Sequence, residues 1–137
     1  MLSLFTPLLL VLAILPRSLP AETVTVRLTA KPLVPRCLDG VEIKDGARHW
    51  QLTPAEHTLT VTTNNQPRSG IPPADPGVAV IRFSLEAAHH YEVELRAPSG
   101  AYSLRVWKKG EWTPVVRDAG TDHIVSGEVA WTDGSCK

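Results

Sequence analysis

The segment AAHHYEVEL, residues 87–95, contains the side chains of this sequence best suited to bind a metal. His89 and His90 are adjacent, and Glu92 follows two positions after His90. Because side chains two residues apart lie on the same face of a β-strand, His90 and Glu92 share one face. Imidazole and carboxylate groups are ligands for zinc and copper. One hypothesis is therefore a small periplasmic protein that binds zinc or copper through His89, His90 and Glu92.

The alternative interpretation is that these histidines are ordinary polar residues. They fall in the connection between two expected strands, where a polar side chain needs no functional explanation. A tight structural zinc site normally uses two spaced pairs of ligands, and the sequence contains no such pairs with cysteine. We therefore expect a protein without a cofactor.

No motif in the sequence indicates catalysis. It lacks GxSxG, HExxH, a P-loop and a Gly-rich dinucleotide turn. Its serines have no His and Asp at a diagnostic spacing, although triads are assembled in space rather than in sequence. The prediction is a protein that is not an enzyme.

Aromatic and basic residues gather around the turn KKGE, residues 108–111. Trp107 and Trp112 flank this turn, and Lys108 and Lys109 lie within it. The alternation of the preceding residues directs Trp107 outward if the apolar residues point inward. Indole rings beside cations can contact a protein surface or a glycan. These four residues form a candidate contact surface; the alternative is that one or two of the tryptophans fill the core.

The first 21 residues have the organisation of a secretory signal peptide. Leu8–Leu15 is an unbroken apolar run, followed by Pro16, Pro20 and the small residue Ala21. The run is shorter than the roughly 20 apolar residues that a membrane-spanning helix needs. We expect cleavage after Ala21, a periplasmic or secreted protein and no integral membrane span in the mature chain, with an uncleaved anchor as the alternative.

The remaining chain, residues 22–137, has a length that normally makes one domain. The whole sequence balances fourteen Lys and Arg against fourteen Asp and Glu. Nucleic acids and anionic lipids select proteins with a basic excess. Neither class of partner is expected.

The two cysteines, Cys37 and Cys136, both lie in the mature chain. In an oxidising compartment a lone pair of cysteines usually forms a disulfide. A redox role is a poor fit, because there is no CxxC motif and no neighbouring histidine to activate a thiolate. We expect a structural disulfide between them, with free or intermolecular thiols as the alternative.

Alternation with a period of two dominates the mature sequence. In ETVTVRLTA, the apolar residues Val24, Val26 and Leu28 alternate with polar ones, as in a half-buried strand. Pro54 lies between two further strands and predicts a hairpin corner. A loose C-terminal extension, residues 119–137, is expected to pack on the domain or to be partly flexible. The other expected strands are RHWQL (48–52), HTLTVTT (57–63), VAVIRFSLEA (78–87), YEVELRA (91–97), AYSLRVW (101–107) and EWTPVV (111–116).

The segment Leu38–Val61 contains LDG followed by LTPAEHTLTV. This pattern resembles the hairpin of PEGA-type domains, which runs roughly I/L-D-G and then L-x-P-G-x-H-x-L-x-V, with Ala55 at the position of the family's turn glycine. About seven short antiparallel strands without a helix predict a β-sandwich, residues 22–118. The resemblance implies that this sandwich is Ig-like. It also implies a non-catalytic accessory or binding module of the bacterial cell envelope, whose partner is an envelope protein or a glycan.

The signal peptide generates the first testable prediction. The mature protein should begin at Glu22 and should accumulate in the periplasmic or extracellular fraction, because the signal is removed during export. N-terminal sequencing of each cell fraction checks this. A soluble cytosolic chain that begins at Met1 would contradict it.

Overall fold

A computed structural model describes residues 22–64, 74–96 and 108–136. The signal peptide and the expected strand 101–107 lie outside the described residues. All regular elements within these ranges are strands. None of the described segments forms a helix of the length and hydropathy needed to cross a membrane. The strands are β1 (Val24–Leu28), β2 (Leu33–Leu38), β3 (Val41–Glu42), β4 (His49–Leu52), β5 (Glu56–Thr63), β6 (Val78–Ser84), β7 (His90–Arg96), β8 (Thr113–Asp118) and β9 (Ala130–Thr132).

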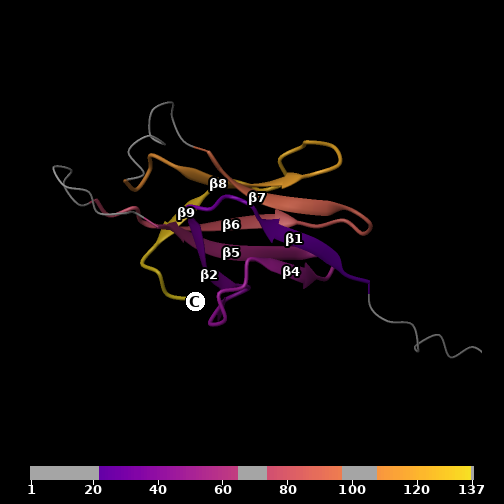
Figure 1. The fold of residues 1–137 in the computed structure, drawn as a ribbon, viewed down its shortest axis with the longest axis horizontal. Helices are drawn as coiled ribbons and strands as arrows, with labels where there is room; N and C mark the ends of the chain where they lie inside the picture. Colours follow the sequence, from indigo (N-terminus) through magenta and orange to yellow (C-terminus); the bar gives the residue numbers. More distant parts are fainter. Residues whose placement is uncertain (1–21, 65–73, 97–107, 137) are drawn as a thin grey trace, which may run out of the picture.

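The strands form two sheets that pack as a β-sandwich (Figure 1). One sheet has four strands in the order β4-β1-β7-β8, and the other has five in the order β3-β2-β5-β6-β9. Neighbouring strands are antiparallel except β1 and β7, which are parallel. The predicted all-β sandwich is confirmed. The parallel pair was not expected, because an alternating strand has the same appearance in either orientation.

The hydrophobic core lies between the two sheets. The inward residues of β1, Val24, Val26 and Leu28, are at most 4% exposed, as their alternation predicts. Burying an aliphatic or aromatic side chain of this kind contributes about 1.5 to 3 kcal/mol. Further core residues come from β7 and β8 of the same sheet and from β5 and β6 of the other, and they are Leu59, Val61, Ala79, Ile81, Phe83, Tyr91, Val93, Leu95 and Val116.

The sequence pattern does not predict the strand β2. Its segment LVPRCL contains Pro35, which lacks a backbone donor and normally excludes a strand with neighbours on both sides. The structure accommodates the proline through an irregularity, since the register with β5 shifts between Pro35 and Cys37. A bulge of this kind leaves one residue unpaired and bends the strand. Leu33, at its start, is fully buried.

The predicted hairpin across Pro54 is wrong. β4 pairs with β1 in the four-stranded sheet, whereas β5 pairs with β2 and β6 in the other sheet. The chain therefore crosses from one sheet to the other at Thr53–Ala55. The crossing is held by a hydrogen bond from Leu85 N to Ala55 O at 3.0 Å. A proline corner indicates a change of direction, but it does not indicate which sheet the next strand joins.

The LDG motif forms a tight hairpin between β2 and β3. Leu38 and Val41 are paired, and the two residues between them, Asp39 and Gly40, have φ of 50° and 79°. Two consecutive positive φ angles are the requirement of a type I′ turn, for which Asp-Gly is a preferred pair. This part of the motif therefore has a clear structural role.

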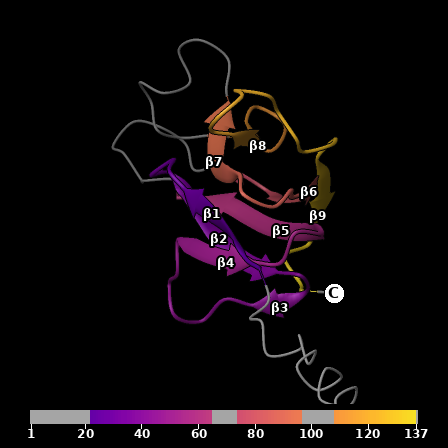
Figure 2. The same ribbon diagram turned by 90° about the vertical axis from the view of Figure 1, so that its right-hand side faces the viewer.

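The C-terminal segment connects the two sheets on one side of the sandwich (Figure 2). Val125 N donates to Val116 O of β8 at 2.8 Å, and Gly127 N donates to Arg82 O of β6 at 3.0 Å. β9 then pairs with β6 as an edge strand. This side of the core is therefore covered by residues 123–132.

The corner at Pro54 generates a prediction about Ala55. Its φ is not positive, so glycine would bring no relief of strain and would only add freedom to the unfolded chain. Ala55→Gly should lower the free energy of unfolding by a few tenths to about 1 kcal/mol. Denaturant unfolding measures this change.

Ala88→Gly is the matched control, because Ala88 has a φ of 66° and glycine relieves that conformation. This variant should be as stable as the parent or more stable. Stabilisation by Ala55→Gly would overturn the assignment of the corner.

Candidate functional site

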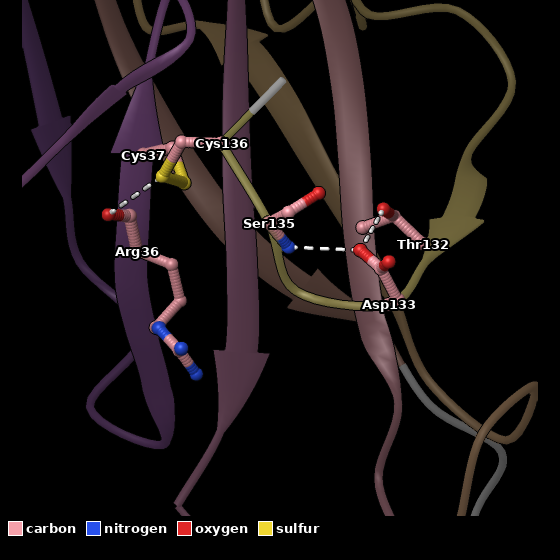
Figure 3. The surroundings of a disulfide bond; sticks show 6 residues. All are labelled: Arg36, Cys37, Thr132, Asp133, Ser135 and Cys136. Atoms are coloured by element: carbon pink, nitrogen blue, oxygen red, sulfur yellow. Dashed lines mark hydrogen bonds between the residues drawn. A yellow bond between two sulfur atoms is a disulfide. The ribbon is translucent and has the colours of Figure 1, made fainter.

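The disulfide joins Cys37 of β2 to Cys136, which follows β9 (Figure 3). The Cα atoms lie 5.7 Å apart, and the bond closes a sequence separation of 99 residues. The turn between β9 and Cys136 is shaped by Asp133, whose Oδ1 accepts a hydrogen bond from Ser135 N at 2.9 Å. The bond therefore ties the end of the chain to the five-stranded sheet, within one chain as the sequence predicts.

His89 is held by a buried carboxylate. Its Nδ1 lies 2.5 Å from Asp118 Oδ2, and Asp118 is 5% exposed at the end of β8. The other carboxylate oxygen accepts hydrogen bonds from Gly120 N at 2.9 Å and Thr121 N at 3.3 Å. The hydrogen bond to Asp118 raises the pKa of His89, and the same bond lowers the pKa of Asp118. The pair therefore favours an imidazolium bound to a carboxylate.

His89 lines an open pocket of about 410 Å³ between residues 88–90 and 118–121. The second ring nitrogen of His89, Nε2, lies 3.7 Å from Glu86 Oε2. An imidazole oriented by a carboxylate can hold or transfer a proton at its free nitrogen. A nucleophilic reaction would further need a hydroxyl or thiol bonded to Nε2, and none of the residues in the described ranges supplies one. The described contacts of His89 are therefore those of an ion pair with Asp118.

The three predicted metal ligands do not converge. Glu92 forms an ion pair with Arg117, which also contacts Glu94 at 2.9 Å. His90 is exposed on the outer face of β7, and His89 is committed to Asp118. Across residues 22–64, 74–96 and 108–136, no three His, Cys, Asp or Glu side chains gather closely enough to hold a metal ion.

His57 joins the two halves of the motif Leu38–Val61. Its Nδ1–H donates to Asp39 Oδ2 at 2.6 Å, and its Nε2–H donates to Thr53 O at 2.8 Å. Both nitrogens face acceptors, so the doubly protonated ring satisfies both contacts. Burial opposes the charge, but the hydrogen bonds to Asp39 and Thr53 outweigh it and raise the pKa of His57 above 6.5. His57 therefore fixes the start of β5 against the Asp-Gly turn.

The residues of the candidate contact surface differ in their exposure in the structure. Lys108 and Lys109 are exposed, as expected. Trp112 is 1% exposed and belongs to the core, so its inclusion in a contact surface is wrong. Its indole packs edge-to-face on Trp131 with ring centroids 5.2 Å apart, and its Nε1–H donates to Pro76 O at 2.8 Å. Trp107 lies outside the described residues.

Two of the residues that organise this region were not singled out in the sequence. Asp118 precedes AGT, and its carboxylate caps the following turn, which is the behaviour expected of an Asx-turn residue. That signal was present in the sequence. Arg117 lies opposite Glu92 in the register of β7 and β8, and this pairing becomes visible only when the neighbouring strands are known.

Comparison of this chain with protein-family models, with curated proteins and with solved structures finds no match.

The contacts of His57 generate a prediction about pH. Because its pKa is raised on folding, its contribution is fully present below about pH 6.5 and is lost as the pH rises through the folded-state pKa. His57→Ala should lower the free energy of unfolding by about 1 to 2 kcal/mol at about pH 5.5, and by less at about pH 8.5. Urea unfolding at both pH values measures the difference.

Asp39→Asn is the matched variant, because it keeps the shape of the side chain and removes the charge that favours the imidazolium. It should reduce the same pH dependence. His89 titrates in the parent and in both variants, so its contribution cancels in the comparison. A loss of stability in His57→Ala that is the same at both pH values would contradict the assignment.

Proposed function

We propose that this chain is a secreted or periplasmic, non-catalytic accessory or binding module of the bacterial cell envelope, which acts by surface contact with an envelope protein or glycan. The observation that carries the proposal is the disulfide between Cys37 and Cys136. Disulfides form and persist in oxidising compartments such as the periplasm and the cell exterior. The signal-like N-terminus, residues 1–21, supports the same compartment.

The pairing of ionisable side chains with one another supports a non-catalytic module. His57 is bound to Asp39 and His89 to Asp118, while Arg117 is surrounded by carboxylates. Side chains that are paired in this way hold strands and turns together. Structural ion pairs also perturb pKa values, so the shifts at the two histidines need no catalytic explanation.

The turn that carries Lys108 and Lys109 is the favoured contact surface. Lys108 N donates to Glu111 Oε1 at 3.0 Å, and Glu111 N donates to Lys108 O at 2.9 Å. Lys109 N donates to Asp75 O at 3.0 Å. The backbone of the turn is therefore held from two sides while both ammonium groups remain exposed. A turn whose backbone is already ordered suits a partner with carboxylate or phosphate groups, because little backbone conformational entropy is lost on contact.

The stem of Lys109 is positioned by Gly77. A Cβ at Gly77 would lie 2.8 Å from Lys109 Cγ and 3.0 Å from Trp131 Cε3. Gly77 also has a φ of 76°, so a side chain is disfavoured there for a second reason. The absent side chain leaves space for Lys109 to lie against the sandwich beside Trp131.

The Ig-like classification and the PEGA-type resemblance belong to the same proposal. The packing of a four-stranded sheet on a five-stranded sheet supports them. So does the role of the motif residues, since His57 bonds to Asp39 of the LDG turn.

The test of this function is co-sedimentation of the purified mature protein with cell-envelope preparations. The double charge reversal Lys108→Glu and Lys109→Glu should reduce retention by at least about tenfold, because the cations would be replaced by like charges against an anionic partner. The matched control reverses Lys31 and Lys44, which are exposed elsewhere on the surface. Retention of the control should match that of the parent. Absence of retention, or equal loss in both double variants, would contradict the proposal.

A further inference from the structure

The outer edge of β4 presents unpaired backbone groups. β4 is the terminal strand of its sheet, and among the described residues no strand pairs with its outer side. Leu28 N donates to Arg48 O at 2.7 Å, and antiparallel pairs exchange hydrogen bonds at every second position. Arg48 and Trp50 therefore direct their backbone groups toward β1. His49 and Gln51 direct theirs away from the sheet.

A second hydrogen bond supports this assignment of inward and outward backbone groups on β4. The residues of β1 that lie opposite His49 and Gln51 are Arg27 and Thr25. Because the backbone groups of β1 point alternately toward β4 and toward β7, those of Thr25, Arg27 and Thr29 must bond to β7. Thr29 N does donate to Val93 O of β7 at 3.1 Å. The outward direction of the groups on β4 therefore follows from two contacts on two different strand pairs.

Within the part of the chain that the structure describes, the other sheet edges are protected and the edge at β4 is not. β8 contains Pro114, and residues 123–126 cover its outer side, where Val125 N bonds to Val116 O. β2, beyond the two residues of β3, contains Pro35 and a register shift. β9 has only three residues. Proline, bulges and short length are the usual means of preventing edge-to-edge pairing, and β4 contains no proline, lysine or bulge.

An apolar groove lies beside this edge. It is an open hollow of about 390 Å³ between β3 and β4, and its apolar lining includes Leu38, Val41, Ile43 and Trp50. Val41 is 68% exposed, the most exposed large hydrophobic residue in the part of the chain that the structure describes. The edge thus combines free backbone groups with apolar surface on its inner side.

We propose that β4 pairs antiparallel with β4 of a second copy of this chain, which joins the two four-stranded sheets into one continuous sheet. With the two-fold axis at Trp50, His49 of each copy lies opposite Gln51 of the other. These are the residues with outward backbone groups, so each His–Gln pair exchanges both of its hydrogen bonds. The two Trp50 residues form the central non-bonded pair, in which opposing side chains lie closest.

A second copy fits this edge because β4 is complementary to itself. Its alternation places Trp50 and Leu52 toward the apolar side and the polar residues outward, which is what the edge requires of a partner strand. The directly opposite pairs are His with Gln and Trp with Trp, so no like charges meet and an aromatic pair forms at the centre. An isologous contact needs this kind of self-complementary surface.

The segment available for pairing is bounded on both sides. Pro54 ends the strand on one side. On the other side, the Arg48 guanidinium is bound to Leu33 O at 2.9 Å and to Ala30 O at 2.8 Å. With the two-fold axis at Trp50, residues 49–51 of one copy therefore pair with residues 51–49 of the other, and Leu52 lies opposite Arg48, which precedes β4. The pairing is independent of the proposed function, because the turn of Lys108 and Lys109 precedes β8, at the opposite edge of the sheet.

The test is the molar mass of the purified mature protein by sedimentation equilibrium, from micromolar to millimolar concentration. The parent should shift from monomer to dimer. Gln51→Pro removes the outward N–H and should weaken dimerisation by at least about tenfold, while a solvent-facing edge position tolerates proline. Gln51→Ala is the matched control, since it also loses the side-chain bond to Thr25 Oγ1 at 2.9 Å but keeps the N–H. It should dimerise like the parent.

If Gln51→Pro does not fold, hydrogen exchange of the backbone amides in the parent protein tests the same pairing. The amides of His49 and Gln51 should exchange slowly at dimer-forming concentration and faster on dilution, whereas the amide of Trp50, which bonds to β1, should change little. A parent that is monomeric over the whole range overturns the proposal. So does a dimer that a folded Gln51→Pro leaves unchanged, or exchange at His49 and Gln51 that does not depend on concentration.

Discussion

The apolar layer between the two sheets is the interaction on which the other features of this molecule depend. Its centre is formed by Val26 and Val93 from one sheet and by Leu59 and Ile81 from the other, all fully buried. Each such side chain contributes about 1.5 to 3 kcal/mol, while the net stability of a domain is only about 5 to 15 kcal/mol. The turns, ion pairs and disulfide therefore act on an arrangement that the core already favours.

Two histidine–aspartate pairs lie where the chain crosses between the sheets. His57, bound to Asp39, is the second residue of β5, just after the crossing from β4. His89, bound to Asp118, lies in the crossing from β6 to β7. A crossing leaves the hydrogen-bonded ladder of one sheet before it enters the other, so side-chain contacts replace backbone ones there. The same residues that suggest metal or acid–base chemistry thus have a structural use.

The two sides of the sandwich are closed to different degrees. The C-terminal segment bonds to β8 and β6 on one side, and the disulfide holds its end on β2. The side formed by β3 and β4 has no such cover among the described residues, and Val41 and the groove lie there. This side therefore presents most of the exposed apolar surface of the described residues.

The sequence by itself determined the all-β class, most of the inward residues and the cysteine pair, because a period of two and a lone pair of cysteines depend only on local geometry and compartment. It did not reveal β2, whose proline is accommodated by a bulge, or the crossing at Pro54. The tertiary structure alone decided the partners of His57 and His89 and the burial of Trp112. Each of these depends on which strands lie side by side, and alternation along one strand carries no information about its neighbours.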